Sequence, residues 1–227
     1  MGNIDDPTNA VHPVPSYSVS VWEGIAIAGG AILLTLIGLA GLGVKALTNA
    51  FDPQRAEAIA HSMIAYEIPG GSRGVFGANV GGGKMAVLSS LAWAEPPPDP
   101  AVAAAPPAVE LFVARIPLAG EMKELDGTDL AARPTYELFS GFSFSYQAPE
   151  AFQVNNNRVA NMALCGVQTP VTIQQGKLTI AEEVTFPAIR YQAEVVLDAD
   201  NQMVVVSALG ETAAQDAARV FGSLQCK

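Results

Sequence analysis

The sequence is poor in the side chains from which most catalytic and metal sites are built. Its 227 residues include two histidines, His12 and His61, and two cysteines. Zinc sites and Ser-His-Asp relays need several such groups that converge on one point, and neither histidine has a second imidazole at ligand spacing. We therefore expect a protein that is not an enzyme and that has no metal site and no cofactor.

Basic side chains are also scarce, and they form no run anywhere in the chain. Twelve Lys and Arg residues face 22 Asp and Glu residues, which gives a formal net charge of −10. Nucleic acids and anionic lipid head groups are bound by clustered Lys and Arg. The composition therefore excludes nucleic acid as a partner, and it excludes docking on anionic head groups.

Two segments resemble ligand-binding loops but lack essential residues. The glycine-rich stretch Gly74–Lys84 has Ala78 where a phosphate-binding loop needs its first Gly, and Met85 where the loop needs Ser or Thr. The stretch Asp198–Asp200 resembles the start of a calcium loop, but the required Gly is missing and Leu209 stands at the twelfth position. We expect both segments to be turns between strands.

The most distinctive feature of the chain is a long stretch without any charge. Residues Gly24–Val44 are 21 consecutive uncharged residues. A helix rises about 1.5 Å per residue, so this stretch would span roughly 30 Å, the thickness of the hydrocarbon core of a bilayer. A signal peptide would have a basic start and an apolar stretch of about 7–15 residues, whereas no Lys or Arg precedes Lys45. We predict a retained transmembrane helix over residues 22–45, with Trp22 as an interfacial anchor, after a flexible tail at residues 1–21.

Small residues in this helix indicate contacts with other helices. Ala26 and Gly30, and likewise Gly38 and Gly41, have spacings that let neighbouring helices approach closely. On a helical wheel, however, the small residues are spread around the whole circumference and form no single stripe. Packing against other membrane-protein subunits is favoured over isolation in the lipid bilayer, and both alternatives stay open.

Residues 46–227 carry the patterns of a folded α+β domain, which begins and ends with a helix. Asp52 and Pro53 are typical of a helix start, and apolar residues at helical spacing predict a helix from Pro53 to Tyr66 that Ile68-Pro69 ends. A closing helix is expected near Thr212–Leu224. Its residues expected to cover a sheet are Ala214, Ala217, Ala218, Phe221 and Leu224.

Between these helices, alternating polar and apolar residues predict a mainly antiparallel sheet. Two strands around a glycine turn are expected within residues 74–90, with further strands at 109–115, 142–146, 159–167, 170–175, 189–197 and 203–208, a polar helix at 122–132, and a turn at 198–202. In the strand at 189–197, Tyr191, Ala193, Val195 and Leu197 share one face. The Pro- and Ala-rich stretch at residues 95–108 is expected to be an extended solvated insertion.

The two cysteines leave two structures open. Cys165 lies on an expected strand and Cys226 lies beside the C-terminal end of the sequence. In an oxidising compartment a disulfide between them would tie the last helix to the sheet. Independent buried thiols are an equal alternative, since Cys is commonly buried without a partner.

Aromatic residues are concentrated near the middle of the domain. Phe142, Phe144 and Tyr146 alternate with serines, as in a half-buried strand. The cluster could be a partner-binding patch or ordinary core beneath the insertion. The strand spacing favours core.

The side of the membrane on which the domain lies receives opposing signals. Lys45 and Arg55 follow the predicted span and no basic residue precedes it, which by the positive-inside rule favours the cytoplasm. The single N-terminal anchor and the pair of cysteines favour the opposite side. We expect the domain on the extracytoplasmic side of a bacterial inner membrane or a photosynthetic membrane.

Three short motifs carry a resemblance to known proteins. With Phe51-Asp-Pro53, Tyr66-Glu-Ile-Pro-Gly70 and Cys165-Gly-Val-Gln-Thr-Pro-Val171, the chain resembles uncharacterised bacterial single-span proteins over most of Phe51–Cys226. The order of elements is also similar to the extrinsic P-type proteins of the photosystem II oxygen-evolving complex, a likeness of fold only. The insertion at residues 95–108 departs from both patterns, and neither resemblance implies catalytic residues.

These observations together predict a non-catalytic accessory subunit. Its helix would pack in a larger photosynthetic or respiratory membrane complex, and its domain would clamp neighbouring subunits. The alternative is a stand-alone membrane-anchored binding module for a small ligand or a transient protein partner.

Overall fold

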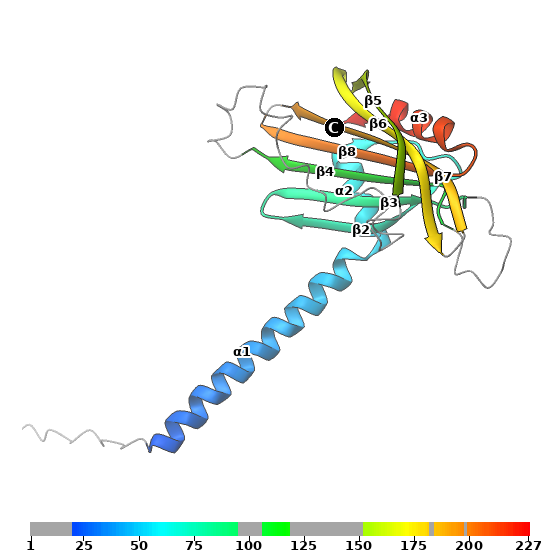
Figure 1. Cartoon of the computed structure of the whole chain (residues 1–227). Helices are drawn as coiled ribbons and strands as arrows, with labels where there is room; N and C mark the ends of the chain where they lie inside the picture. Colours follow the sequence, from blue (N-terminus) through cyan, green and yellow to red (C-terminus); the bar gives the residue numbers. More distant parts are fainter. Residues whose placement is uncertain (1–19, 95–105, 119–151, 182–183, 198) are drawn as a thin grey trace, which may run out of the picture. The chain divides into compact units, whose positions relative to one another are not determined.

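The structure consists of an N-terminal helical unit and a larger folded domain. The computed structural model describes residues 20–94, 106–118, 152–181, 184–197 and 199–227 (Figure 1). The first unit ends at Lys45 and the second extends from Ala46 to Lys227. Helix α1 runs over Val21–Ala50, so its last five residues belong to the second unit, and its stretch from Ile25 to Ala50 is long and apolar enough to cross a membrane.

The domain is built on a seven-stranded sheet in which every neighbouring pair is antiparallel. The strand order is β2-β3-β4-β8-β7-β6-β5 (Figure 1). The strands are β2 (Ser72–Val80), β3 (Gly83–Ser90), β4 (Val109–Pro117), β5 (Phe152–Leu164), β6 (Val167–Ala181), β7 (Val184–Leu197) and β8 (Asp200–Leu209). A second, two-stranded sheet joins β1 (Ile64–Ala65) to β9 (Gln225–Cys226). The predicted α+β class with a mainly antiparallel sheet is confirmed.

Two helices pack on one face of the large sheet. Helix α2 (Pro53–Met63) begins where predicted, because the Asp52 carboxylate accepts hydrogen bonds from the amides of Gln54 and Arg55 at 3.0 and 3.4 Å. Helix α3 (Ala213–Ser223) lies nearer the other end of the sheet, against β7 and β8. Both helices contribute to the main apolar core.

Alternation along the strands places this core on the helix-covered face. Tyr191, Ala193 and Val195 are buried there, as their spacing predicts. The opposite face carries two smaller apolar clusters. One is centred on Val87, Phe112, Ala114 and Val205, and the other on Ala94, Leu178, Ala188 and Leu209. We call this opposite side the second face of the sheet.

Helix α2 approaches strand β2 closely, and two glycines permit the approach. A Cβ atom on Gly77 would lie 2.6 Å from the Cα of Ala56, and a Cβ atom on Gly74 would lie 2.7 Å from the Cβ of Ala56. Ala56 is itself fully buried. The small side chains at these three positions therefore set the distance between helix and sheet.

The ends of several elements differ from the sequence prediction. Helix α2 ends at Met63 instead of Tyr66, because Ile64 and Ala65 leave the helix to pair with β9. The closing helix does not bury Ala214 and Ala218, which are exposed. Its buried side chains are Ala213, Ala217, Val220 and Phe221.

Two segments expected to be solvated loops belong in part to the sheet. The predicted turn at 198–202 is shorter, since β8 begins at Asp200 and Gln202 is buried. Residues 106–108 of the predicted insertion lie against the sheet, where the Leu209 amide of β8 donates to the Ala108 carbonyl at 2.9 Å. The strand expected at 142–146 and the helix at 122–132 lie outside the described residues.

Replacing Gly77 with alanine tests the close approach of α2. We expect G77A to lower the free energy of unfolding by about 1–3 kcal/mol, because the added methyl group forces the helix away from β2. Denaturant titration of the full chain in detergent, followed by near-UV circular dichroism, measures the change. G83A is the matched control, since its Cβ would lie 3.4 Å or more from its neighbours. Equal effects of the two variants would contradict the packing described.

Candidate functional site: the apolar helix, the disulfide corner and a polar row

The residues predicted to pack against other helices all lie open on α1. Trp22 is 79% exposed and Ala26 is exposed. A Cβ atom built on Gly30, Gly38 or Gly41 would meet no atom within 4 Å. Within the described chain, the helix therefore has no packing partner at these positions, and its small residues are available for contacts with lipid or with other proteins.

The surface of α1 is too apolar to be stable in water. Thirteen large apolar side chains between Val21 and Leu47 are more than half exposed. Leaving such side chains in water costs about 1.5–3 kcal/mol each, and thus on the order of 20 kcal/mol for the set. Within the charge-free residues Gly24–Val44, the hydroxyl of Thr35 donates to the carbonyl of Ala31 at 2.8 Å, so this donor is satisfied inside the helix and does not oppose transfer into an apolar phase.

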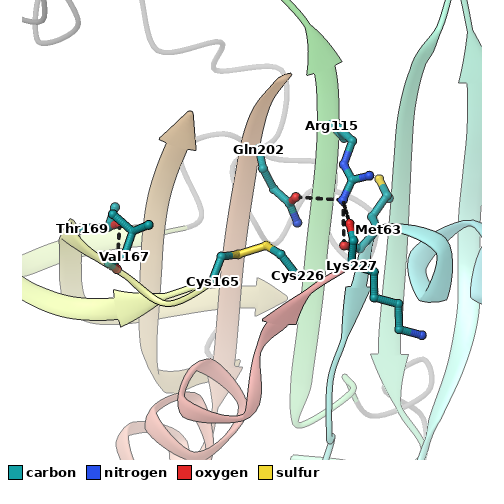
Figure 2. Close-up of a disulfide and its surroundings, with 8 residues drawn as sticks. All are labelled: Met63, Arg115, Cys165, Val167, Thr169, Gln202, Cys226 and Lys227. Atoms are coloured by element: carbon teal, nitrogen blue, oxygen red, sulfur yellow. Dashed lines mark hydrogen bonds between the residues drawn. A yellow bond between two sulfur atoms is a disulfide. The ribbon is translucent and has the colours of Figure 1, made fainter. Parts of the chain in front are cut away.

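A disulfide joins the two cysteines and forms one corner of the domain (Figure 2). The Cα atoms of Cys165 and Cys226 are 4.9 Å apart, although 61 positions separate them in the sequence. Cys165 was predicted to lie on a strand. The structure places it instead in the two-residue turn with Gly166 between β5 and β6. The bridge therefore ties the tip of this hairpin to β9.

The hairpin turn holds Cys165 in an unusual backbone conformation. Its φ angle is +56° and that of Gly166 is +79°, the values of a type I′ turn, which favours Asn-Gly. Among the described non-glycine residues, Cys165 alone has a positive φ. Since the left-handed region costs an L-residue about 1–2 kcal/mol, the conformation of Cys165 lowers the local stability of the turn.

Next to the disulfide, Arg115 connects four segments of the chain (Figure 2). Its Nη2 donates to the carbonyls of Met63 and Lys227 at 3.0 and 2.7 Å, and to Oε1 of Gln202 at 3.3 Å. The Lys227 amide in turn donates to the Met63 carbonyl at 3.1 Å. These three partners of the guanidinium are acceptors of the protein itself, so the group is a structural clasp that holds the end of α2, β4, β8 and the residue after β9 together.

A row of polar side chains crosses the second face of the sheet. Strand register aligns Ser89, Glu110, Ser207, Arg190 and Gln174 on five successive strands, β3, β4, β8, β7 and β6. Ser89, Glu110 and Ser207 are at most 5% exposed. We call these five residues the polar row. It runs between the two apolar clusters of the second face and was not predicted from the sequence.

Within the polar row, burial changes the properties of Arg190 and Ser207. The Arg190 guanidinium donates to Oε1 of Gln174, at 3.0 Å from its Nε, and lies 5.6 Å from the centre of the Phe152 ring. Burial lowers the pKa of this guanidinium. The hydroxyl of Ser207 has no hydrogen-bond partner within the described part of the chain. Buried polar groups of this kind mark either a ligand contact or a local cost in stability.

The remaining predicted sites are exposed or lie outside the described residues. His61 is exposed and stacks on the ring of Tyr66 with the ring centres 4.8 Å apart. No group of three or more His, Cys, Asp or Glu side chains in the described residues could hold a metal ion. His12 and the aromatic cluster of Phe142, Phe144 and Tyr146 lie outside the part that the structure describes.

Comparisons with known proteins give only distant structural likeness. No family model matches the sequence, and no curated protein matches it. Among solved structures, the chain is similar to LpqN, involved in cell envelope biogenesis of Mycobacterium tuberculosis, at 11% identity and a TM-score of 0.40, over 72% of this chain and 83% of that one. A likeness at this TM-score carries no argument about function. The expected similarity to the photosystem II proteins finds no support in these comparisons.

Replacing Ser207 with alanine tests whether its hydroxyl is unpaired. We expect S207A to leave the free energy of unfolding unchanged or to raise it slightly, because no hydrogen bond is lost. S90A is the control: the Ser90 hydroxyl donates to the Ala92 carbonyl at 2.6 Å and accepts from the Val109 amide at 3.1 Å, so its loss should cost about 1–3 kcal/mol. A comparable loss in S207A would reveal a partner for that hydroxyl.

Replacing the disulfide tests both the clasp and the backbone of Cys165. For a loop of 61 positions the chain-entropy model gives a loss of about 4 kcal/mol when the bridge is removed. We expect C165N/C226S to be more stable than C165V/C226S by about 1–2 kcal/mol, because Asn tolerates a positive φ and a β-branched residue does not. Urea unfolding of both double variants measures the difference. Equal stability would show that the turn relaxes once the bridge is gone.

Proposed function

We propose that this protein is a non-catalytic accessory subunit of a larger membrane complex. In this proposal α1 crosses the bilayer and the sheet domain lies outside the cytoplasm, where it contacts neighbouring subunits. The observation that carries the proposal is the surface of α1, with thirteen exposed large apolar side chains and open glycines at positions 30, 38 and 41. Such a surface needs lipid or other helices around it.

The disulfide supports the extracytoplasmic side. Disulfides form and persist in oxidising compartments and are rare in the cytosol. The Cys165–Cys226 bridge holds β9 to the turn between β5 and β6. The opposing signal consists of two basic residues, Lys45 and Arg55, after the span. Two basic residues are a weak signal for the side of the membrane. The disulfide is a stronger signal, because the domain would lose stability in a reducing compartment where the bridge does not form.

The polar row favours a second candidate function, a stand-alone anchored binding module. Ligand sites are commonly apolar with a few converging polar groups. On the second face, Glu110, Ser207 and Arg190 stand in register between two apolar clusters. In this alternative the helix serves only as an anchor, and the domain acts without other subunits.

Fractionation and thiol trapping test the location of the domain. We expect the full chain to stay in the membrane pellet after alkaline carbonate extraction, because α1 is integrated. When intact cells are treated with a membrane-permeant thiol-alkylating reagent, we expect the protein to be labelled only if a reductant is added first, since both cysteines are bridged. Complete extraction by carbonate would exclude the anchor, whereas free thiols in an integral protein would place the domain in the cytoplasm.

Native electrophoresis of protein solubilised in mild detergent separates the two candidates. An accessory subunit should migrate with other proteins, whose identity by mass spectrometry would test the predicted photosynthetic or respiratory host. We expect G30L and G38L to release the subunit, because larger side chains prevent close helix approach. L34I, which keeps the volume of an exposed side chain, is the control. Migration of the wild type by itself would exclude the subunit and favour the binding module.

A further inference from the structure

Among the described strands, β5 forms one long outer edge of the sheet. It is the last strand in the order, and among the described strands only β6 pairs with it. Seven consecutive residues, 153–159, are exposed, so both faces of the strand are uncovered there. Val154 and Val159 are 43% and 66% exposed. An edge of this kind presents unpaired backbone groups to another strand.

Within the part of the chain that the structure describes, α2 covers the other edge of the sheet, whereas no helix covers the edge at β5. At β2, the Gly74 amide donates to the carboxylate of Glu57 on α2 at 3.0 Å, and the ring of Phe51 packs against Phe76 with centres 5.5 Å apart. The protection common on edge strands consists of Lys, Pro, bulges or covering helices. Strand β5 contains no Pro or Lys, and its bulge falls between Val154 and Asn156. From Asn156 to Leu164 its pairing with β6 is regular.

We propose that the outer edge of β5 pairs with β5 of a second copy of this chain. The two strands would run antiparallel about a twofold axis centred on Val159, which joins the two seven-stranded sheets into one. Antiparallel strand addition supplies a row of backbone hydrogen bonds without any change in the fold of either copy.

The side chains of β5 suit pairing with themselves in this register. On the second face, Asn157, Val159 and Asn161 are all exposed. Centring on Val159 brings the two copies of this apolar side chain together and places Asn157 opposite Asn161 of the second copy. Asn amides both donate and accept hydrogen bonds, so these pairs complement each other. The single charge of the strand, on Arg158, then faces Ala160 of the second copy and not its own equivalent.

The contact between two β5 strands is small, so its stability depends on both copies being held in one membrane. In this respect the inference rests on the proposed anchoring by α1. A contact of one strand pair is smaller than the roughly 1,200–2,000 Å² of stable interfaces between freely diffusing proteins. Anchors that confine both copies to one bilayer raise their effective concentration, so that a smaller contact suffices.

Cysteine cross-linking of the full chain in membranes tests the pairing. Cross-strand partners have Cα atoms about 4.5–5.5 Å apart, within the range of a disulfide. We expect V159C to form a covalent dimer on mild oxidation, seen as a doubling of mass on a non-reducing gel. The native cysteines are bridged to each other and provide no background. V80C, at a 77% exposed position on β2, is the control for random encounter. Cross-linking of V159C no stronger than that of V80C, or to a different protein, overturns the proposal.

A charge variant provides an independent measurement. V159K would place two lysines opposite each other, so we expect loss of the dimer in sedimentation of the detergent-solubilised chain, with unfolding unchanged because the side chain is exposed. V80K should leave the dimer intact. A V159K dimer as stable as the wild type overturns the pairing.

Membrane fractionation distinguishes the failure of the anchoring proposal from the failure of the strand pairing. If the protein is not in the membrane, the anchoring proposal fails, and cross-linking of concentrated soluble V159C still decides for or against the strand pairing.

Discussion

The pairing of β1 with β9 is the contact on which the rest of the domain depends. It joins the residues directly after α2 to residues just beyond the end of α3, Ile64 to Cys226 and Ala65 to Gln225. The disulfide extends this contact to the tip of the β5–β6 hairpin, and Arg115 extends it to β4 and β8. Both helices are thereby fixed over the same sheet face, and the large core between them and the sheet follows from that placement.

With one face of the sheet occupied by helices, the other surfaces acquire different properties. The second face carries two apolar clusters separated by the polar row, in which Glu110 and Ser207 are buried. The β2 edge is covered by α2, because Gly74 and Gly77 allow the helix to come close. The β5 edge has no such cover among the described elements. The asymmetry of the two edges is a direct result of where the helices lie.

The proposed location has to satisfy two parts of the molecule that need different environments. The surface of α1 favours an apolar environment, and the bridged cysteines favour an oxidising one. A domain held just outside a membrane meets both conditions.

Local patterns in the sequence determined the apolar helix, the N-terminus of α2 at Asp52, the buried positions of β7, and the α+β class. Each depends on residues within one or two turns of helix or within a single strand, where spacing alone fixes the exposed and buried sides. The end of α2 at Met63 could not be predicted in this way, because its cause is a pairing with β9 more than 150 residues later. Ser207 is the one polar residue in the apolar run 203–209 of β8, and its alignment with Glu110 and Arg190 exists only once the strands are ordered. The tertiary structure likewise decided that Cys165 and Cys226 are joined, since contacts between distant segments depend on the register of the whole sheet and not on local spacing.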